Sequence, residues 1–184
     1  FVHEMLVADA MIAKAKTRDE RMAALTAAIE ALRGPYYAVV AQATFDRDVR
    51  DAADRGQPLT ADSISKIYCD AKARYSPKSI ARGEGECLNW VTEPYIYYDM
   101  YFYRYLLATS AAAWFAERIE GGDRRAAGGL KDLLRAGGSE DGPTLLKRAG
   151  FDVTDPAGYA AMTRRLERLT TALEQEVGPG RSSH

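Results

Sequence analysis

The residues most able to do chemistry are a run of tyrosines near the middle of the sequence. Six of the 11 tyrosines fall within the 11 residues from position 95 to position 105. At about 100° per residue, a helix would place Tyr97, Tyr98, Tyr101 and Tyr105 within an arc of about 100°, on one face. Such a face is more commonly an aromatic packing stripe, but it can also line a cleft with hydroxyl donors. The residues alone leave both interpretations open.

Other catalytic motifs are incomplete or absent in the sequence. Residues 3–7, HEMLV, begin like the helical HExxH zinc motif, but Val7 stands where the second histidine would bind the metal. The only other histidine is His184, at the opposite end of the chain. No glycine-rich phosphate loop or nucleophile elbow occurs. Cys69 and Cys87 lack metal-ligand spacing and are predicted to be reduced thiols. The sequence therefore predicts no metal ligands in this chain.

Length and composition are those of an ordinary globular protein. The 184 residues are 47% hydrophobic and 28% charged, with a net charge of -1, so one sizeable core is expected. This near-neutral charge balance lacks the excess of Lys and Arg that is typical of nucleic-acid-binding proteins. The longest stretch without a charge, residues 105–116, is far shorter than the roughly 20 residues of a membrane span, and no export signal opens the chain. The predicted location is the cytoplasm, with neither nucleic acid nor membrane as a partner.

Apolar residues recur at helical spacing nearly throughout, and strand signals are absent. The expected helices cover residues 1–16, 17–32, 36–54, 60–75, 95–120, the segment up to 135, 143–149, and a last one that begins at Thr154-Asp155-Pro156. Thr17 and Glu20 have the spacing of a capping box, and Gly34-Pro35 is expected to break the second helix. The predicted fold class is all-α, as a single helical domain or domain fragment over residues 1–178 with a flexible tail at 179–184.

A long irregular segment, residues 76–94, leads into the tyrosine run. It contains Gly83, Gly85 and two prolines, and its apolar residues do not recur at a regular helical or strand spacing. Loops of this length are uncommon unless they work at a site. We therefore expect this segment to work at a site, next to the tyrosines that follow it.

Four stretches of the sequence follow one another in an order shared with a known family. They are residues 4–9; residues 59–62 with Tyr68 and Tyr75; Trp90, Pro94 and the tyrosines from Tyr97 to Tyr105; and residues 134–139 followed by 145–152. In this order they resemble the zinc metallopeptidases of the oligoendopeptidase F type, which are relatives of thimet oligopeptidase. The resemblance covers nearly the whole chain and aligns it with the helical C-terminal part of the family's zincin-type catalytic domain.

The resemblance implies that the parent protein hydrolyses peptide bonds in short peptides. Zinc would polarise the scissile carbonyl and activate the attacking water, and hydroxyl donors would stabilise the oxyanion. Tyr98 and Tyr101 are the implied catalytic donors, while Tyr95, Tyr97 and Tyr105 are the implied substrate-binding residues. A phenol suits the donor role, because its pKa near 10 keeps it protonated at neutral pH.

The zinc ligands of the family are not found in this chain. The family uses an HExxH motif and a later glutamate, and the favoured register puts that glutamate just upstream of Phe1. A second register makes Glu4 the ligand but needs a gap before Thr17. In both registers the HExxH is missing. We therefore expect a fragment that alone binds no zinc and cleaves no peptide, and whose partners are short peptides and the upstream half of the same catalytic domain.

Two departures from the family pattern favour a rival hypothesis. Tyr95 stands where the family usually has a histidine, and Val39 and Val40 replace a Gln-Thr pair. The rival is a non-catalytic helical interaction module derived from the same family. Its tyrosine face, extended by the small residues Ala108 and Ala112, would bind a partner or another helix.

Overall fold

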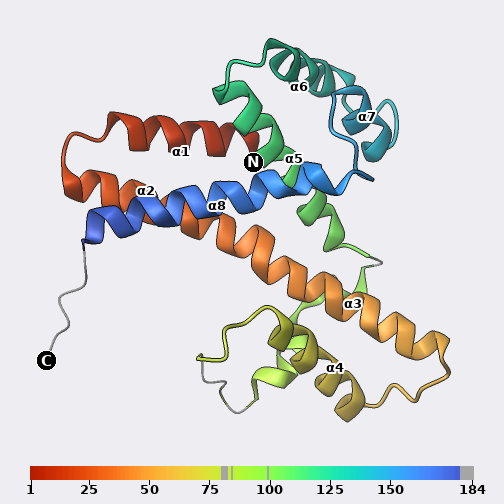
Figure 1. Ribbon diagram of the computed structural model, residues 1–184. Coiled ribbons are helices and arrows are strands. Elements are labelled where there is room, and N and C mark those ends of the chain that lie inside the picture. The colour runs from red at the N-terminus through yellow and green to blue at the C-terminus, as the bar shows by residue number, and fades with distance from the viewer. Residues whose placement is uncertain (80–82, 84, 99, 179–184) are drawn as a thin grey trace, which may run out of the picture. The chain divides into compact units, whose positions relative to one another are not determined.

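The computed structural model describes residues 1–79, 83, 85–98 and 100–178. Within these ranges the chain is built from helices and has no strand, which confirms the all-α prediction (Figure 1). The elements are α1 (Val2–Lys14), α2 (Arg18–Leu32), the π-helix η1 (Arg33–Ala38), α3 (Val39–Asp54), α4 (Ala61–Arg74), the 3-10 helices η2 (Glu86–Thr92) and η3 (Pro94–Tyr97), α5 (Tyr103–Glu120), α6 (Arg124–Ala136), α7 (Gly142–Arg148) and α8 (Pro156–Val177). The tail predicted to be flexible, residues 179–184, lies outside the described residues.

Contacts between residues divide the chain into two compact units. The first combines Phe1–Leu32 with Leu107–His184, and the second is the continuous segment Arg33–Leu106. The first unit therefore joins the two ends of the chain, and the second contains the predicted site. The prediction of one helical domain over residues 1–178 stays a prediction.

In the first unit, α2 packs against both α1 and α8 (Figure 1). Leu25 of α2 and Leu169 of α8 are fully buried in this layer, as is Met162. A further core group joins α5 to the segment after α7 through Phe115 and Phe151. Burial of one such large apolar side chain contributes about 1.5–3 kcal/mol, so the cores hold these helices together far more strongly than helix propensity does.

Local sequence signals explain where several helices begin. The Thr17 hydroxyl accepts a hydrogen bond from the Glu20 backbone N–H at 3.2 Å, and the Glu20 carboxylate accepts one from the Thr17 N–H at 3.3 Å. The predicted capping box is thus present at the start of α2. The Asp155 side chain accepts from the Ala157 N–H at 2.9 Å and Pro156 opens α8, as predicted.

The predicted break at Gly34-Pro35 is wrong. The chain stays helical there and forms the π-helix η1, which connects α2 to α3. Proline lacks the backbone N–H and its ring clashes with a carbonyl one turn earlier in a regular α-helix. A π-turn is wider by one residue, which accommodates the proline without ending the helix.

The predicted tyrosine helix over residues 95–120 is wrong in its first part. The α-helix α5 begins only at Tyr103, and the preceding residues Pro94–Tyr97 form the short helix η3. Between them, Met100 has a φ of 47°. That is the left-handed region, which a right-handed helix of L-residues does not enter. The predicted site tyrosines therefore do not share one helix face.

The prediction that Cys69 and Cys87 are reduced thiols is also wrong, because the two form a disulfide in the second unit. Cys69 lies in α4 and Cys87 in η2, with their Cα atoms 5.0 Å apart. Residue count and motif spacing do not reveal that η2 folds back along α4. The bond ties the irregular segment before the tyrosines to a regular helix.

We expect this disulfide to stabilise the second unit by about 3 kcal/mol, since it closes a loop with a sequence separation of 18. Urea unfolding with and without a phosphine reductant measures the effect, and the Cys69→Ser/Cys87→Ser variant serves as the control that no longer responds to the reductant. Labelling of both thiols in denatured, unreduced protein would contradict the bond itself.

Candidate active site

The second unit gathers the tyrosines into a cluster of rings. Tyr95 stacks on Tyr101 with ring centroids 4.9 Å apart and planes 7° from parallel. The ring of Tyr98 lies 6.3 Å from that of Tyr95 and 6.0 Å from that of Tyr101. On a straight helix, residues six apart are separated by about 9 Å along the axis, so the stack depends on the break at Met100.

Tyr101 and Tyr105 form a pair of hydroxyl groups at the edge of the cluster. Their hydroxyl oxygens are 3.0 Å apart, and their ring centroids are 5.5 Å apart. The hydrogen bond with Tyr105 raises the pKa of Tyr101 above its ordinary value of 10.0, against the opposing charge of Arg104. The Tyr101 hydroxyl therefore stays protonated at neutral pH, and it donates to a ligand only when Tyr105 supplies the proton of the hydroxyl pair.

The cluster presents its rings to solvent over a buried phenylalanine. Tyr95, Tyr97 and Tyr98 are 46%, 71% and 60% exposed, whereas Phe102 is 6% exposed. Phe102 lies edge-on to Tyr95 at 6.5 Å and to Tyr101 at 6.1 Å. Within the part of the chain that the structure describes, Tyr97 makes no ring contact. The predicted site residues Tyr95, Tyr98, Tyr101 and Tyr105 are thus brought together, and Tyr97 stands apart from them.

A small aromatic core fixes the segment that leads to the cluster. Phe45 of α3 and Tyr68 of α4 meet edge to face at 5.2 Å, and Trp90 and Ile96 pack against them. The Trp90 indole N–H also donates to the Ser65 hydroxyl at 3.0 Å. With the Cys69–Cys87 bond, these contacts hold η2 and η3 against α4. The segment from which the tyrosine run continues is therefore fixed in position.

Sequence reasoning missed several of these positioning residues. Glu93 accepts a hydrogen bond from the Tyr95 backbone N–H at 3.3 Å, and Pro94 opens η3. An acidic residue before a proline is a helix-start signal that was available in the sequence. By contrast, no local signal pairs Trp90 with Ser65 or places Phe102 beneath the stack, because both depend on tertiary packing.

The described residues do not build a zinc site. Among them, no group of three or more His, Cys, Asp or Glu side chains gathers in a way that could hold a metal ion. His3 and Glu4 are exposed on α1, and the sulfurs of Cys69 and Cys87 are bonded to each other. Because a zinc site needs at least three protein ligands, these residues do not fit the metal that the resemblance implies.

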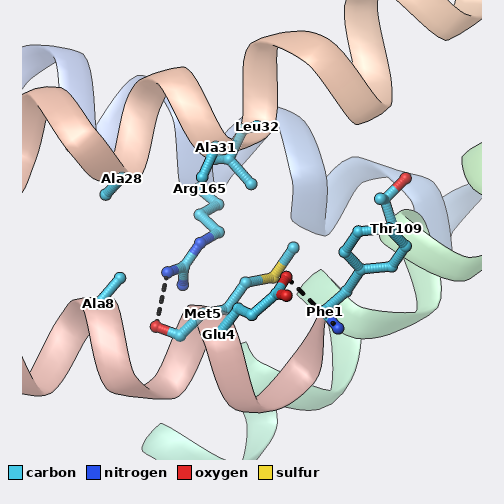
Figure 2. A pocket seen from close by; sticks show the side chains of 9 residues that line it. All are labelled: Phe1, Glu4, Met5, Ala8, Ala28, Ala31, Leu32, Thr109 and Arg165. Carbon is cyan, nitrogen blue, oxygen red and sulfur yellow. Dashed lines mark hydrogen bonds and ion pairs between the residues drawn. The ribbon is translucent and has the colours of Figure 1, made fainter.

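A cavity in the first unit is too small to be a substrate site (Figure 2). It has a volume of about 30 Å³ and is lined mainly by α1 and α2 residues such as Met5, Ala8, Ala28 and Leu32, together with Arg165 of α8. Pockets for small molecules are typically about 300–1,000 Å³, whereas one water needs about 10–15 Å³. This cavity has room for a water or two, and the tyrosine cluster remains the candidate active site.

Comparison with solved structures shows the class of fold. The chain is similar to the crystal structure of oligoendopeptidase-F from Enterococcus faecium, with a TM-score of 0.90 and 21% sequence identity, over 96% of this chain and 34% of that one. The two therefore share the helical fold of this class of oligopeptidase. The sequence profile of peptidase family M3 matches residues 1–164. The chain belongs to peptidase family M3, and the resemblance to the oligoendopeptidase F type is confirmed.

Relatives of known name are similar over nearly the whole chain. Oligopeptidase PepF of Bacillus subtilis is 26% identical over 173 residues, which are 94% of this chain and 26% of that protein. Group B oligopeptidase PepB of Streptococcus agalactiae is 24% identical over 178 residues, 97% of this chain and 30% of that protein. The chain thus spans less than a third of the length of either relative.

Proposed function

We propose that this chain is the C-terminal part of a zinc oligopeptidase that hydrolyses short peptides. In this proposal its tyrosines bind the substrate and stabilise the oxyanion. The observation that carries the proposal is the ring cluster of Tyr95, Tyr98 and Tyr101, in which Tyr95 and Tyr98 are exposed, with the hydroxyl pair of Tyr101 and Tyr105, in a chain of peptidase family M3.

Tyr98 and Tyr101 are the proposed catalytic donors. Attack on a peptide carbonyl moves negative charge onto its oxygen, and a preorganised hydroxyl that donates to this oxygen stabilises the transition state. Tyr101 is held by its stack on Tyr95 and by its bond to Tyr105, which favours preorganisation. Tyr98 is 60% exposed beside it, within reach of a bound molecule.

Tyr95, Tyr97 and Tyr105 are the proposed substrate-binding residues. The exposed rings of Tyr95 and Tyr97 offer apolar faces to the side chains of a peptide. Tyr105 is the residue that orients the Tyr101 hydroxyl, since the two oxygens are 3.0 Å apart. Its removal is therefore expected to disturb Tyr101 as well as the substrate.

The proposed partner, besides short peptides, is the upstream half of the same catalytic domain, which would also supply the zinc ligands. An apolar groove of about 730 Å³ lies between α1 and α2, lined by Val7, Met11, Ala23 and Ala27 among others. Val7 and Met11 are 57% and 59% exposed. Large apolar patches on soluble proteins tend to be covered by a partner, which supports contact with the upstream half at this groove.

The cytoplasm is retained as the proposed location, as the sequence predicts. The Cys69–Cys87 disulfide argues in the other direction, because such bonds persist mainly in oxidising compartments. Rapid thiol trapping in the source cells decides between the two, since a fully oxidised pair would place the protein outside the reducing cytoplasm. Among the described helices, none is long and apolar enough to cross a membrane.

Cleavage of short fluorogenic peptides tests the proposed function. We expect the intact parent protein to cleave them, a chelator to abolish that cleavage, and the 184-residue chain alone to be inactive. Adding the separately produced upstream half to the chain should restore cleavage, and Met11→Arg in the α1–α2 groove should weaken this restoration. Full activity of the chain alone would show that the ligand assignment is wrong.

The alternative is a non-catalytic helical interaction module. The observation that favours it is Tyr95, which occupies the place of the family histidine and whose ring is stacked on Tyr101. An intact parent that binds zinc but cleaves no peptide, and that gains cleavage on Tyr95→His, would support the hypothesis that this protein is a non-catalytic module.

A further inference from the structure

The tyrosine run contains one cation, Arg104. Residues 95–105 include no other Lys or Arg, and their one acidic residue, Asp99, lies outside the described residues. Arg104 is exposed in the first turn of α5. A positive charge is therefore available at the surface beside a cluster of uncharged rings.

Arg104 is held beside Tyr101. Its guanidinium carbon lies 6.0 Å from the centroid of the Tyr101 ring, at the limit of a cation–π interaction. The backbone N–H of Arg104 also donates to the Tyr101 carbonyl oxygen at 3.4 Å. The hydrogen bond with Tyr105 raises the pKa of Tyr101, and the charge of Arg104 opposes this rise. The guanidinium thus acts electrostatically on the same tyrosine that stacks on Tyr95.

The guanidinium of Arg104 differs from those of other exposed arginines in its partners. Arg74, Arg118 and Arg164 lie 2.8, 3.1 and 2.7 Å from a carboxylate oxygen. Among the residues that the structure describes, no carboxylate forms an ion pair with Arg104, whose contact is the Tyr101 ring. A guanidinium over a ring keeps the N–H donors of its edge, and these match the two oxygens of a carboxylate. Arg104 is therefore able to accept an incoming carboxylate.

A short peptide carries a carboxylate at its C-terminus, and Asp and Glu side chains add others. The rings of Tyr95 and Tyr98 offer apolar faces but no charge to such a group, and a carboxylate loses favourable hydration when it is covered. We propose that Arg104 is a specificity-determining residue of the tyrosine cluster and binds a carboxylate of the peptide substrate. This inference rests on the proposed function, because it defines the substrate of that same site.

The position of Arg104 determines how this contact should affect kinetics. Arg104 is next to Tyr101, the proposed donor to the scissile carbonyl, so the bound carboxylate lies close to the bond that is cut. The hydrogen bonds between Arg104 and the carboxylate form in the bound substrate and persist in the transition state. Such uniform binding lowers KM and leaves kcat nearly unchanged.

Calorimetry with three matched peptides tests the contact without requiring turnover. The protein is the intact parent after treatment with a chelator, so that no metal competes for the peptide. The probes are acetyl-alanyl-alanyl-phenylalanine, its C-terminal amide, and the same amide with glutamate in place of the first alanine. The wild type should bind a probe with a carboxylate about tenfold more tightly than the plain amide, and this ratio should fall to about one in Arg104→Gln.

The three probes also separate the two sources of the carboxylate. Tighter binding of the free acid assigns the contact to the peptide C-terminus, whereas tighter binding of the glutamyl amide assigns it to an acidic side chain, and both results support the proposal. Equal affinities of the wild type for all three probes would overturn it.

Arg118→Gln is the matched control. Arg118 also lies on α5 over an aromatic ring, with its guanidinium carbon 4.4 Å from the centroid of Trp114, but it is paired with Asp123 at 3.1 Å. This variant should keep the probe preference of the wild type. A carboxylate preference that persists unchanged in Arg104→Gln would refute the proposal, because another cation would then be responsible.

Steady-state kinetics separates this proposal from the proposed function. On a substrate with the preferred carboxylate, Arg104→Gln should raise KM by about tenfold with little change in kcat, and it should leave the matched substrate without that carboxylate unaffected. A parent that cleaves no peptide but binds the carboxylate probes through Arg104 would refute the peptidase and retain the carboxylate site. A parent that cleaves both substrates equally well, and binds the three probes equally, would retain the peptidase and refute the site.

Discussion

Tyr98→Phe and Tyr101→Phe, each made in the intact parent protein, should lower kcat by about 10²–10³. Each change removes one hydroxyl donor and leaves the ring in place, so the packing of Tyr95 against Tyr101 is preserved. KM should change little, because an interaction that forms only in the transition state does not contribute to ground-state binding. Steady-state kinetics on a short fluorogenic peptide measures both parameters.

A structural role for these tyrosines predicts a different pattern. Phenylalanine would then serve nearly as well as tyrosine, and only truncation to alanine would harm the protein, through loss of folding stability. Tyr103→Phe is the matched control, since Tyr103 is exposed in the first turn of α5 and bears no proposed role. Full turnover in both the Tyr98 and Tyr101 phenylalanine variants would show that the cluster is a packing feature.

Helix starts were the part of the fold that sequence reasoning predicted well. The capping box at Thr17 and Glu20 and the Asp155-Pro156 start of α8 depend on side chains within a few residues of the backbone groups they satisfy. The π-turn at Gly34-Pro35 could not be predicted in this way, because the same dipeptide ends many helices.

For the candidate site, residue types were predictable and their arrangement was not. The density of tyrosines between positions 95 and 105 pointed to this segment, and Tyr95, Tyr98 and Tyr101 do gather there. Their role in a site stays a prediction. The assumed helix was wrong, since the left-handed Met100 lets rings six residues apart stack. Tyr101 also packs edge-on against Phe102 at 6.1 Å, a contact that hydrophobic periodicity does not encode.

Phe151→Ala should destabilise the first unit by about 3–5 kcal/mol, the range for removal of a buried phenylalanine. Phe151 is fully buried and packs edge to face with Trp114 at 5.9 Å and with Tyr159 at 5.6 Å. Its loss leaves a cavity at the centre of the core that joins α5 to the segment after α7. Urea unfolding followed by tryptophan fluorescence should report the change directly, because Trp114 borders the cavity.

Gly158 in α8 provides a second variant that tests the same packing from the opposite side. A Cβ atom at this position would lie 2.9 Å from Phe151 Cε2, so Gly158→Ala alone should overpack the core and cost about 1–3 kcal/mol. When Phe151 is also changed to alanine, the clash is removed and the added methyl group occupies part of the cavity. The double variant should therefore lose less stability than the sum of the two single changes. Strict additivity would mean that the two positions are not coupled, and would contradict the expected clash at Gly158.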